Sequence, residues 1–503
     1  METLTHILNG FAICLQPINL WYTFIGVFLG TIIGVLPGIG PSAGMALLIP
    51  ITFGMDPTSA LIMMAGIYYG TKYGGSTTSI LIRTPGEASS VMTSIDGYEM
   101  AKKGRAGAAL AVSAIGSFIA GTIGIVALTI FAIPLASMAL KFGPAEYFTL
   151  MLFAMTAVAS LTGASPAKGM LSAVLGLMIA TIGIDLQSGQ PRFTMGFPEF
   201  QDGIGFVVVV VGLFALSEVF RGMEGIHKGT APQMIRIRGK LWLTREEWRR
   251  SIGPMWRGGI IGFVIGVLPG AGGTIASILA YTTEKRLSKH PEEFGHGAIE
   301  GVAAPEAANN SDTAGALVPL LTLGVPGGGA TAVLLGAFIM YGIQPGPLLF
   351  QNRPDLVWGL VDSMYIGNIM LLILNLPLIG IFVRLLYIPS GILYPLIVTI
   401  SAIGAYAING SVTDLYLILV FGISGYTFDR VDIPVAPLVL SLVLGGMMEQ
   451  SFRQAMTISG GDPKIFVGSA ITVTLVVLSV ISVITPFILA RFKPFRDATA
   501  QAD

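Results

Sequence analysis

Two short clusters of small polar residues lie inside otherwise apolar stretches of the sequence. The first is Gly74-Gly75-Ser76-Thr77-Thr78-Ser79 and the second is Asn309-Asn310-Ser311-Asp312-Thr313. After each cluster comes a short apolar stretch that ends in a Pro-Gly pair, and both clusters begin as helix N-caps would. The unpaired N–H groups of a helix N-terminus suit a carboxylate, whereas carbonyl and hydroxyl oxygens suit a small hard cation such as sodium.

This chemistry predicts two adjoining sets of site residues near the membrane centre. The set expected to bind an anionic substrate is Lys72, Gly75, Ser76, Thr77, Thr78, Asn309, Asn310 and Ser311. The set expected to bind the cation is Gly38, Gly40, Gly270, Gly272, Asp312 and Thr313. The alternative is that the hydroxyl and amide groups only connect helices to one another in lipid.

The glycines of the cation set come from a repeated helix-breaking sequence. Ile-Gly-Val-Leu-Pro-Gly occurs at 33–38 and again at 265–270, each time in the middle of an apolar segment. Broken backbone is tolerated at membrane depth only when it is buried in protein or lines a cavity. Paired interruptions at matching places in two halves of a chain indicate the binding site of a secondary transporter. A single copy would be read as a kink in a packed helix.

Composition determines the fold class. The chain has 503 residues, of which 53% are hydrophobic and 11% are charged, compared with about 25% charged in a soluble domain. We therefore expect an all-α polytopic membrane protein with about 10–14 transmembrane helices, surrounded by a lipid bilayer. The formal net charge is zero, so no nucleic-acid partner is expected.

The distribution of Lys and Arg predicts the orientation. Nine of them lie between 221 and 257, and further ones lie at 285–289 and in the tail 491–503, so these segments are predicted to be cytoplasmic. Segment 258–283 has basic residues on both sides, which favours a re-entrant hairpin that enters and leaves on the inner face. The first copy has no Lys or Arg before Lys72, which favours a hairpin from the outer face. We therefore predict two inverted repeats, 1–220 and 258–490, joined by the basic linker 221–257.

Charged residues within apolar regions are functional candidates. Lys72 and Arg83 are expected to attract or bind carboxylates. Lys72 is equally compatible with a snorkelling or loop-facing position, and Arg83 with anchoring the turn at Pro85. Glu300 and Glu306 are expected mainly to form surface ion pairs with the basic loops. The group Asp429, Arg430 and Asp432 is expected to be an interfacial loop with a structural ion pair.

Four long stretches together resemble one family. They are "IGVLPGIGP", "YYGTKYGGSTTSILIRTPGE", "IEGVAAPEAANNSDTAGALVPLLTLGVPG" and "GYTFDRVDIPVAPLVLSLVLGGMMEQSFRQA". In this order they look like the large membrane subunit (TctA family) of the bacterial tripartite tricarboxylate transporters, over residues 15 to 460.

The resemblance implies a permease of the bacterial inner membrane that imports di- or tricarboxylate-type organic anions. It implies sodium as the coupling ion and no other cofactor. It also implies two partners: a small membrane subunit of about four helices and a periplasmic solute-binding protein. The sequence leaves a homo-oligomer open.

Three other classes of function were compared with this one. An intramembrane enzyme is not expected, because all four histidines (His6, His227, His290 and His296) lie outside the apolar segments. An organic-anion channel also needs polar backbone at membrane depth, but two oppositely facing hairpins favour alternating access of the elevator type. A proton-coupled carrier remains the alternative to sodium coupling, since Asp312 is the one acid in the two clusters.

Overall fold

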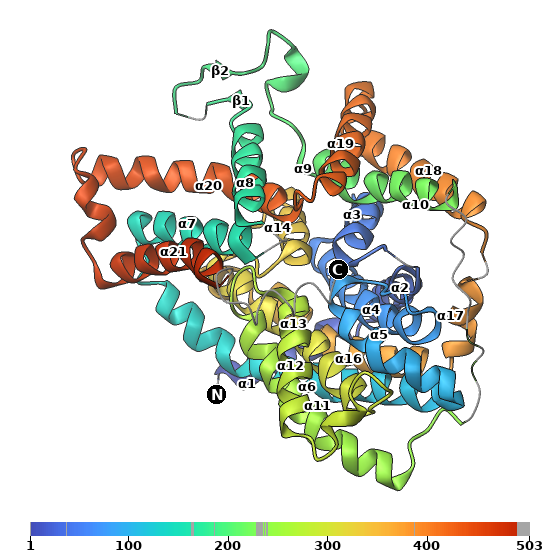
Figure 1. The fold of residues 1–503 in the computed structure, drawn as a ribbon. Helices are drawn as coiled ribbons and strands as arrows, with labels where there is room; N and C mark the ends of the chain where they lie inside the picture. Colours follow the sequence, from blue (N-terminus) through green and yellow to red (C-terminus); the bar gives the residue numbers. More distant parts are fainter. Residues whose placement is uncertain are drawn as a thin grey trace.

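The computed structural model describes residues 2–36, 38–161, 165–185, 187–227, 235, 237, 240–386 and 388–489. In these residues the chain is almost entirely helical, which confirms the all-α class (Figure 1). The sheet they contain is a two-stranded hairpin in which β1 (Gly183–Ile184) pairs with antiparallel β2 (Pro191–Arg192). The predicted tail 491–503, Pro37 and part of the basic linker lie outside the described residues.

Six of the helices in the first half of the chain begin with proline. They are α1 (Glu2–Cys14), α2 (Pro17–Val35), α3 (Pro41–Thr52), α4 (Pro57–Ile82), η1 (Ala88–Ser90), α5 (Val91–Met100), η2 (Ala101–Arg105), α6 (Ala106–Ala139), α7 (Pro144–Leu161), α8 (Pro166–Ala180), η3 (Pro198–Phe200), α9 (Phe206–Val210), η4 (Val211–Leu216) and α10 (Ser217–His227).

The helices of the second half begin with α11, which starts inside the linker and carries four of the linker's basic residues. They are α11 (Arg245–Gly266), α12 (Gly272–Leu287), η5 (Pro291–Glu293), α13 (Glu300–Leu323), α14 (Gly329–Met340), α15 (Leu349–Asn352), α16 (Pro354–Asn375), α17 (Ile379–Leu385), α18 (Ser390–Asn409), α19 (Val412–Arg430), α20 (Ala436–Ile458), η6 (Pro463–Val467) and α21 (Ala470–Leu489).

Both copies of the repeated sequence break a helix, as predicted. The first break separates α2 from α3, and the second separates α11 from α12. Gly38 and Gly270 have φ values of 87° and 83°, in the left-handed region that glycine adopts without steric cost. The helical path is therefore interrupted at Gly38 and at Gly270.

Glycines at every fourth position bring the broken segments onto the helices that carry the polar clusters. A Cβ at any of these glycines would lie 2.2–2.6 Å from a carbonyl oxygen of the partner helix, so the helices pack backbone against backbone. The glycines are Gly26, Gly30 and Gly34 on α2, which pack against α4, and Gly258, Gly262 and Gly266 on α11, which pack against α13.

The polar clusters do not lie at helix N-termini, and that expectation was wrong. Both clusters lie well inside continuous helices, α4 and α13, that begin many residues earlier. The two helices are interrupted instead after their polar clusters, at their C-terminal ends. Arg83 ends α4 and Gly324 ends α13, both in the left-handed conformation with φ of 57° and 71°. The Pro-Gly pairs that follow then start the next helical segment.

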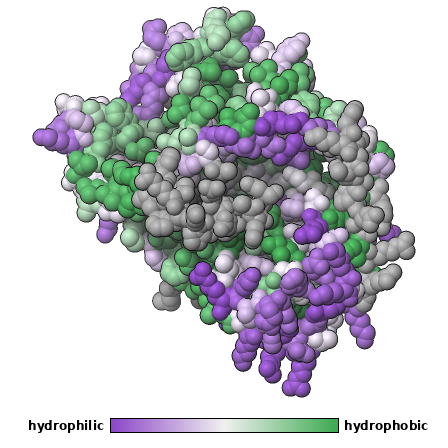
Figure 2. All heavy atoms as spheres, viewed as in Figure 1, coloured by the Kyte–Doolittle hydropathy of each residue, from purple (hydrophilic) through white to green (hydrophobic). Residues whose placement is uncertain are grey.

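Basic loops gather on one face of the molecule, here called the basic face. Lys103 donates to the carbonyl of His296 at 2.6 Å, and Arg105 pairs with Glu247 at 2.7 Å. Arg250 of α11 pairs with Glu300, as predicted, at 2.7 Å. Figure 2 shows hydrophilic side chains clustered at the lower end of the view, where α11 begins in Figure 1.

A second group of helices, α7, α8, α20 and α21, lies together on the left of Figure 1. In the first turn of α8, Lys168 Nζ lies 3.5 Å from Asp432 Oδ2. The β-hairpin follows the end of α8. The charge group predicted to be interfacial is therefore paired with other segments; Asp429 contacts Arg221 at 3.1 Å and Arg430 pairs with Glu224.

Six helices of the described part of the chain are both long enough and apolar enough to span a membrane. They cover 17–35, 88–139, 206–224, 354–375, 391–409 and 412–430. Shorter apolar helices occur at 41–52, 166–180, 329–340 and 470–485. These segments are consistent with a multi-pass membrane protein. The predicted number of crossings remains a prediction, because α4 and α13 are long but carry polar clusters, and the other apolar helices are short.

Candidate functional site

A buried ion pair connects α4 to the loop that follows it. Lys72 Nζ lies 3.1 Å from Glu87 Oε2, and the two side chains are only 5% and 3% exposed. Lys72 also donates to Ser89 Oγ at 3.0 Å. The turn at Pro85 and Gly86 brings Glu87 back to the helix, since Gly86 N–H donates to the Gly75 carbonyl at 3.3 Å. Lys72, predicted to bind a substrate carboxylate, is thus neutralised by a carboxylate of the protein.

The helix α13 supplies two further side chains to this pair. Asn309 donates its amide N–H to Glu87 Oε1 at 2.7 Å. Asn309 and Asp312 are three residues apart on α13, so they share one face of the helix. Both are buried.

Gly273, at the start of α12, lies where these side chains meet. A Cβ placed on Gly273 would be 2.9 Å from Lys72 Nζ, 3.0 Å from Asn309 Oδ1 and 3.0 Å from Asp312 Oδ2. The second Leu-Pro-Gly turn is held nearby by a hydrogen bond from Gly270 N–H to the Gly327 carbonyl, at 2.8 Å. We call Lys72, Glu87, Gly273, Asn309 and Asp312 the central cluster.

The central cluster has oxygen atoms without partners. Asn309 Oδ1 and Asp312 Oδ1 are buried and accept no hydrogen bond within the described part of the chain. A buried oxygen without a partner costs free energy. When all three groups are ionised, two carboxylates face one ammonium group, so the cluster has excess negative charge. Carboxylate and amide oxygens with this charge balance fit a small hard cation better than an anion.

The other predicted residues of the second cluster face elsewhere. Asn310 donates to Ser117 Oγ of α6 at 2.7 Å and to the Glu306 carbonyl at 3.0 Å. Ser311 Oγ approaches Gly124 of α6, within 2.9 Å of an ideal Cβ. Residues 310 and 311 turn away from 309 and 312 because each helical residue advances about 100°. Thr313 is also buried on α13.

In the first cluster, most hydroxyl groups are bound by their own helix. Ser76 and Thr78 donate to the carbonyls of Tyr73 and Gly75, at 2.8 and 3.0 Å. Gly75 instead lies against the central cluster, since its Cβ would be 3.0 Å from Glu87 Cγ. Thr77 is buried in the same helix.

The four glycines expected in the cation set do not converge. A Cβ on Gly38 would meet Glu218 of α10, and one on Gly270 would meet the backbone of α7. A Cβ on Gly272 would meet no described atom within 4 Å outside its own segment, although Gly272 directly precedes Gly273 of the central cluster. Gly40 also borders this cluster, since its ideal Cβ position lies 3.9 Å from Glu87 Cβ.

Sequence reasoning missed Glu87 and Gly273. A signal for Glu87 existed, because a lysine inside an apolar helix requires a counter-charge, and Glu87 is the next acid along the chain. Glu306 was assigned to a surface ion pair, which was wrong: it is fully buried and accepts from Thr93 Oγ1 at 2.5 Å. Arg83 is the C-cap residue of α4, and its guanidinium lies 5.8 Å from the ring centroid of Tyr98. The predicted anchoring of the Pro85 turn by its side chain stays a prediction.

Asp96 of α5 is a further acid that the sequence did not single out. Its Oδ1 accepts N–H bonds from Gly295, Gly297 and Ala298 at 2.7–2.9 Å. Its Oδ2 accepts from Tyr281 OH at 2.8 Å. This carboxylate fastens the first half of the chain to the loop between α12 and α13.

Comparison with known proteins adds to this geometry. A model of the tripartite tricarboxylate transporter TctA family matches residues 20–440. The "Uncharacterized 52.8 kDa protein in TAR-I ttuC' 3'region" of Agrobacterium vitis is 49% identical over 484 residues, which cover 96% of each chain. The "Uncharacterized protein in TAR-II ttuC' 3'region" of the same organism is 50% identical over 223 residues, which cover 44% of this chain and 92% of the relative.

Proposed function

Because the chain belongs to the tripartite tricarboxylate transporter TctA family, we propose that it is the permease of a sodium-coupled importer of di- or tricarboxylate anions. As a transporter subunit it is not expected to have catalytic residues. Its partners are a small membrane subunit and a periplasmic binding protein, as the family's tripartite organisation implies. Its place is the bacterial inner membrane.

The observation that carries the sodium assignment is the central cluster. The unpartnered oxygens of Asn309 and Asp312, together with the excess negative charge, support a cation held between α4, α12 and α13. A bound sodium ion would both balance the excess negative charge and be coordinated by the unpartnered oxygens of Asn309 and Asp312. Residues Lys72 and Glu87 would position Asn309 through its hydrogen bond to Glu87.

The directions from which the chain approaches the two helix breaks support inverted repeats. α11 starts on the basic face beside Glu300 and turns back in α12, which ends at Leu287 before the loop held by Asp96. α3 instead leads away from the first break to Thr52, its last residue, whose carbonyl accepts a hydrogen bond from Tyr341. With the basic face in the cytoplasm, the second turn enters from inside and the first from outside. Such a pair suits alternating access by an elevator movement.

A proton-coupled carrier is the second candidate. Two acids of α13, Glu306 and Asp312, are fully or almost fully buried, and intramembrane acids form proton relays in transporters. Sodium remains the first choice, because Asn309 adds an amide oxygen that binds a metal ion but carries no proton at neutral pH.

Uptake into proteoliposomes tests the proposal. Vesicles containing this chain, its small subunit and its binding protein are given radiolabelled di- and tricarboxylates, with an inward sodium gradient or an inward proton gradient. Accumulation above equilibrium that depends on sodium is the expected result. Accumulation driven only by protons would replace sodium with the second candidate. Equilibration without accumulation under both gradients would mean a channel, and the carrier would be rejected.

A further inference from the structure

The geometry points to a second anion site, separate from the central cluster, in a cavity that contains Arg353 and opens on the face opposite the basic loops. Its ligand would be a carboxylate anion arriving from outside the cell. This inference rests on the proposed import of organic anions and adds to it a receiving site that precedes the central cluster. The cavity has a volume of about 480 Å³, within the range of small-molecule sites.

Six polar side chains line this cavity. None of them is hydrogen-bonded through its side chain to another described residue. They are Gln344, Asn352, Arg353, Gln450, Ser451 and Gln454. Carboxamide N–H groups and a guanidinium group are the donors that carboxylates accept from, and arginine binds them with two parallel hydrogen bonds.

Arg353 gives the cavity its charge. It is the single charged side chain among the described residues of the lining. Its nearest acid, Asp355, is 54% exposed and reaches only Nε, at 3.7 Å, which is longer than a hydrogen bond. Exposed pairs of this kind contribute little, so the guanidinium is available to a ligand. A cation has no acidic side chain to bind to among these lining residues.

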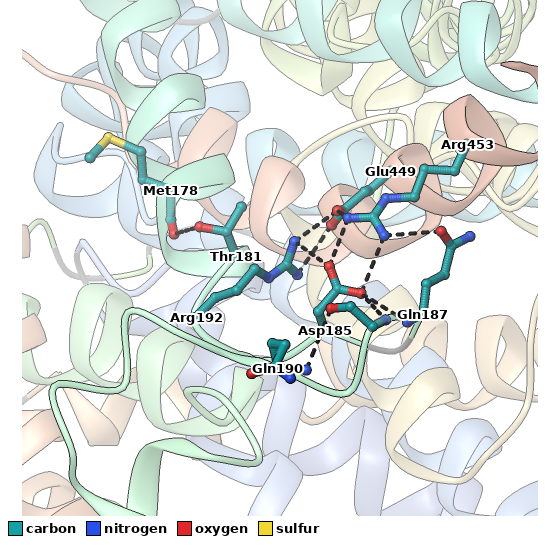
Figure 3. Close-up of polar contacts among 9 residues, drawn as sticks. Met178, Thr181, Asp185, Gln187, Gln190, Arg192, Glu449 and Arg453 are labelled. Atoms are coloured by element: carbon teal, nitrogen blue, oxygen red, sulfur yellow. Dashed lines mark hydrogen bonds and ion pairs between the residues drawn. The ribbon is translucent and has the colours of Figure 1, made fainter. Parts of the chain in front are cut away.

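Charges beside the cavity do not cancel that of Arg353. The neighbouring face of α20 carries Glu449 and Arg453, which meet Asp185 and Arg192 of the β-hairpin (Figure 3). Arg453 lies 2.7 Å from Asp185, and Arg192 lies 2.8 Å from Glu449. Two acids are thus matched by two arginines, and the network stays neutral next to a cavity that is positive.

The position of the cavity is that of an outer entrance. α6 starts at the basic face next to Arg105 and has 34 residues, about 50 Å of helix, which exceeds a bilayer core of about 30 Å. α7 therefore begins on the opposite face, and its Tyr147 and Met151 line the cavity. If the basic face is cytoplasmic, the cavity opens outward.

The cavity is also connected to the central cluster through α13. Leu323, at the end of α13, forms part of its wall, and Gly346 of the wall donates to the Leu321 carbonyl at 3.2 Å. The same helix carries Asn309 and Asp312. An anion leaving the cavity along α13 would approach the cation site, where the bound cation would attract it.

Transport kinetics of Arg353 variants test this site. In the reconstituted system above, Arg353→Gln is compared with Arg353→Lys and with Arg384→Gln, which removes an exposed arginine of α17. The probe is the carboxylate of the panel that the unaltered protein accumulates. We expect Arg353→Gln to raise the KM for that carboxylate about tenfold or more, the effect of losing a charge-assisted hydrogen bond. Half-saturation by sodium should be unchanged, Arg353→Lys should be intermediate, and Arg384→Gln should behave as the unaltered protein.

A second measurement separates an anion site from a docking surface. The affinity of the substrate-free binding protein for the permease in nanodiscs should be the same for Arg353→Gln and the unaltered protein. Weaker association would mean that Arg353 binds the partner protein and would overturn the anion site. An unchanged KM would also overturn it, while leaving the proposed import intact. Absence of accumulation by the unaltered protein would instead reject the proposed function.

Discussion

The Lys72 ammonium and the Glu87 carboxylate form a 3.1 Å ion pair whose side chains are almost completely buried. Two parts of the chain that are distant in sequence meet at this pair, because Lys72 of α4 and Glu87 after the Pro85 turn are joined by Asn309 of α13, which donates to Glu87. The pair therefore joins the two halves of the protein beside the oxygens of the candidate cation site. Its effect on stability can be separated from its effect on transport.

Removing one member of the pair should destabilise the protein strongly. Glu87→Ala leaves the Lys72 ammonium buried without a counter-charge, which costs about 3–5 kcal/mol in soluble proteins. We expect a lower Tm in detergent and loss of uptake. The double variant Lys72→Met/Glu87→Met removes both charges and should recover most of the Tm but not the uptake. A double variant as unstable as Glu87→Ala would show that the charges are not what the packing depends on.

Asp312→Asn should act on sodium and not on folding. The substitution keeps the shape of the side chain but removes a charge whose Oδ1 has no protein partner in the described residues. We expect half-saturation by sodium to increase at least about tenfold, as for loss of one charged ligand, with Tm and protein yield retained. Asp355→Asn, which removes an exposed acid, is the matched control. Equal sodium dependence in the two variants would place the cation elsewhere.

A methyl group at Gly273 should compete with the cation for space. The added Cβ would lie 2.9–3.0 Å from Lys72 Nζ, Asn309 Oδ1 and Asp312 Oδ2, where a bound ion would need to approach. Gly273→Ala is expected to lower the initial rate of sodium-driven uptake about tenfold at fixed protein level, since a closely packed site tolerates little extra volume. The control is Gly328→Ala, whose Cβ meets no described atom within 4 Å. A Gly273→Ala protein as active as the control would contradict a cation at this position.

The sequence predicted the helix breaks at both Leu-Pro-Gly copies because proline and glycine act locally on the backbone. It also brought the right segments together, since Lys72, Asn309 and Asp312 do meet. It failed on the polar clusters as N-caps, because glycines of α2 and α11 pack so closely against α4 and α13 that both helices continue through their polar residues. The spacing of these glycines at every fourth position indicates close helix packing, but it does not say which distant helix is the partner.

The choice between neighbours on α13 was equally inaccessible. Asn309 faces the ion pair and Asn310 faces α6, yet the two residues are identical and adjacent. Only the rotation of α13 against α6 and α12 decides between them. Glu87 is the next acid after Lys72, but its contact with Lys72 also requires the left-handed turn at Arg83, where glycine would be the expected residue.

The ion-pair network between the β-hairpin and α20, formed by Asp185, Arg192, Glu449 and Arg453, should weaken in acid. Arg453 lowers the pKa of Asp185 through a hydrogen bond, and Arg192 does the same for the pKa of Glu449. Groups with lowered folded-state pKa values stabilise the fold above their ordinary pKa values of 3.8 and 4.5, and that contribution is lost as pH falls further. Hydrogen exchange in 181–205, corrected for the intrinsic rate, should be constant from about pH 8 to pH 5 and faster below about pH 4.

Arg453→Gln should make this segment exchange faster even at neutral pH, because the hydrogen bonds to Asp185 are lost, at 3.2 and 2.7 Å. Arg384→Gln should leave its exchange unchanged. Protection that does not differ between Arg453→Gln and the unaltered protein would show that the hairpin is held by its backbone pairing alone.

Close helix packing should be the feature least tolerant of substitution. Gly262 of α11 approaches α13 so closely that a Cβ would lie 2.2 Å from the Ala308 carbonyl oxygen. Leucine there must push the helices apart, and this would also displace Asn309 from Gly273. We expect the Gly262→Leu variant to lose most of the folded yield of the unaltered protein in detergent, because overpacking and lost contacts act together. Gly446→Leu on α20, where no described atom lies within 4 Å, should fold normally. If both variants gave the same folded yield by size-exclusion chromatography, α11 and α13 would not be packed through these glycines.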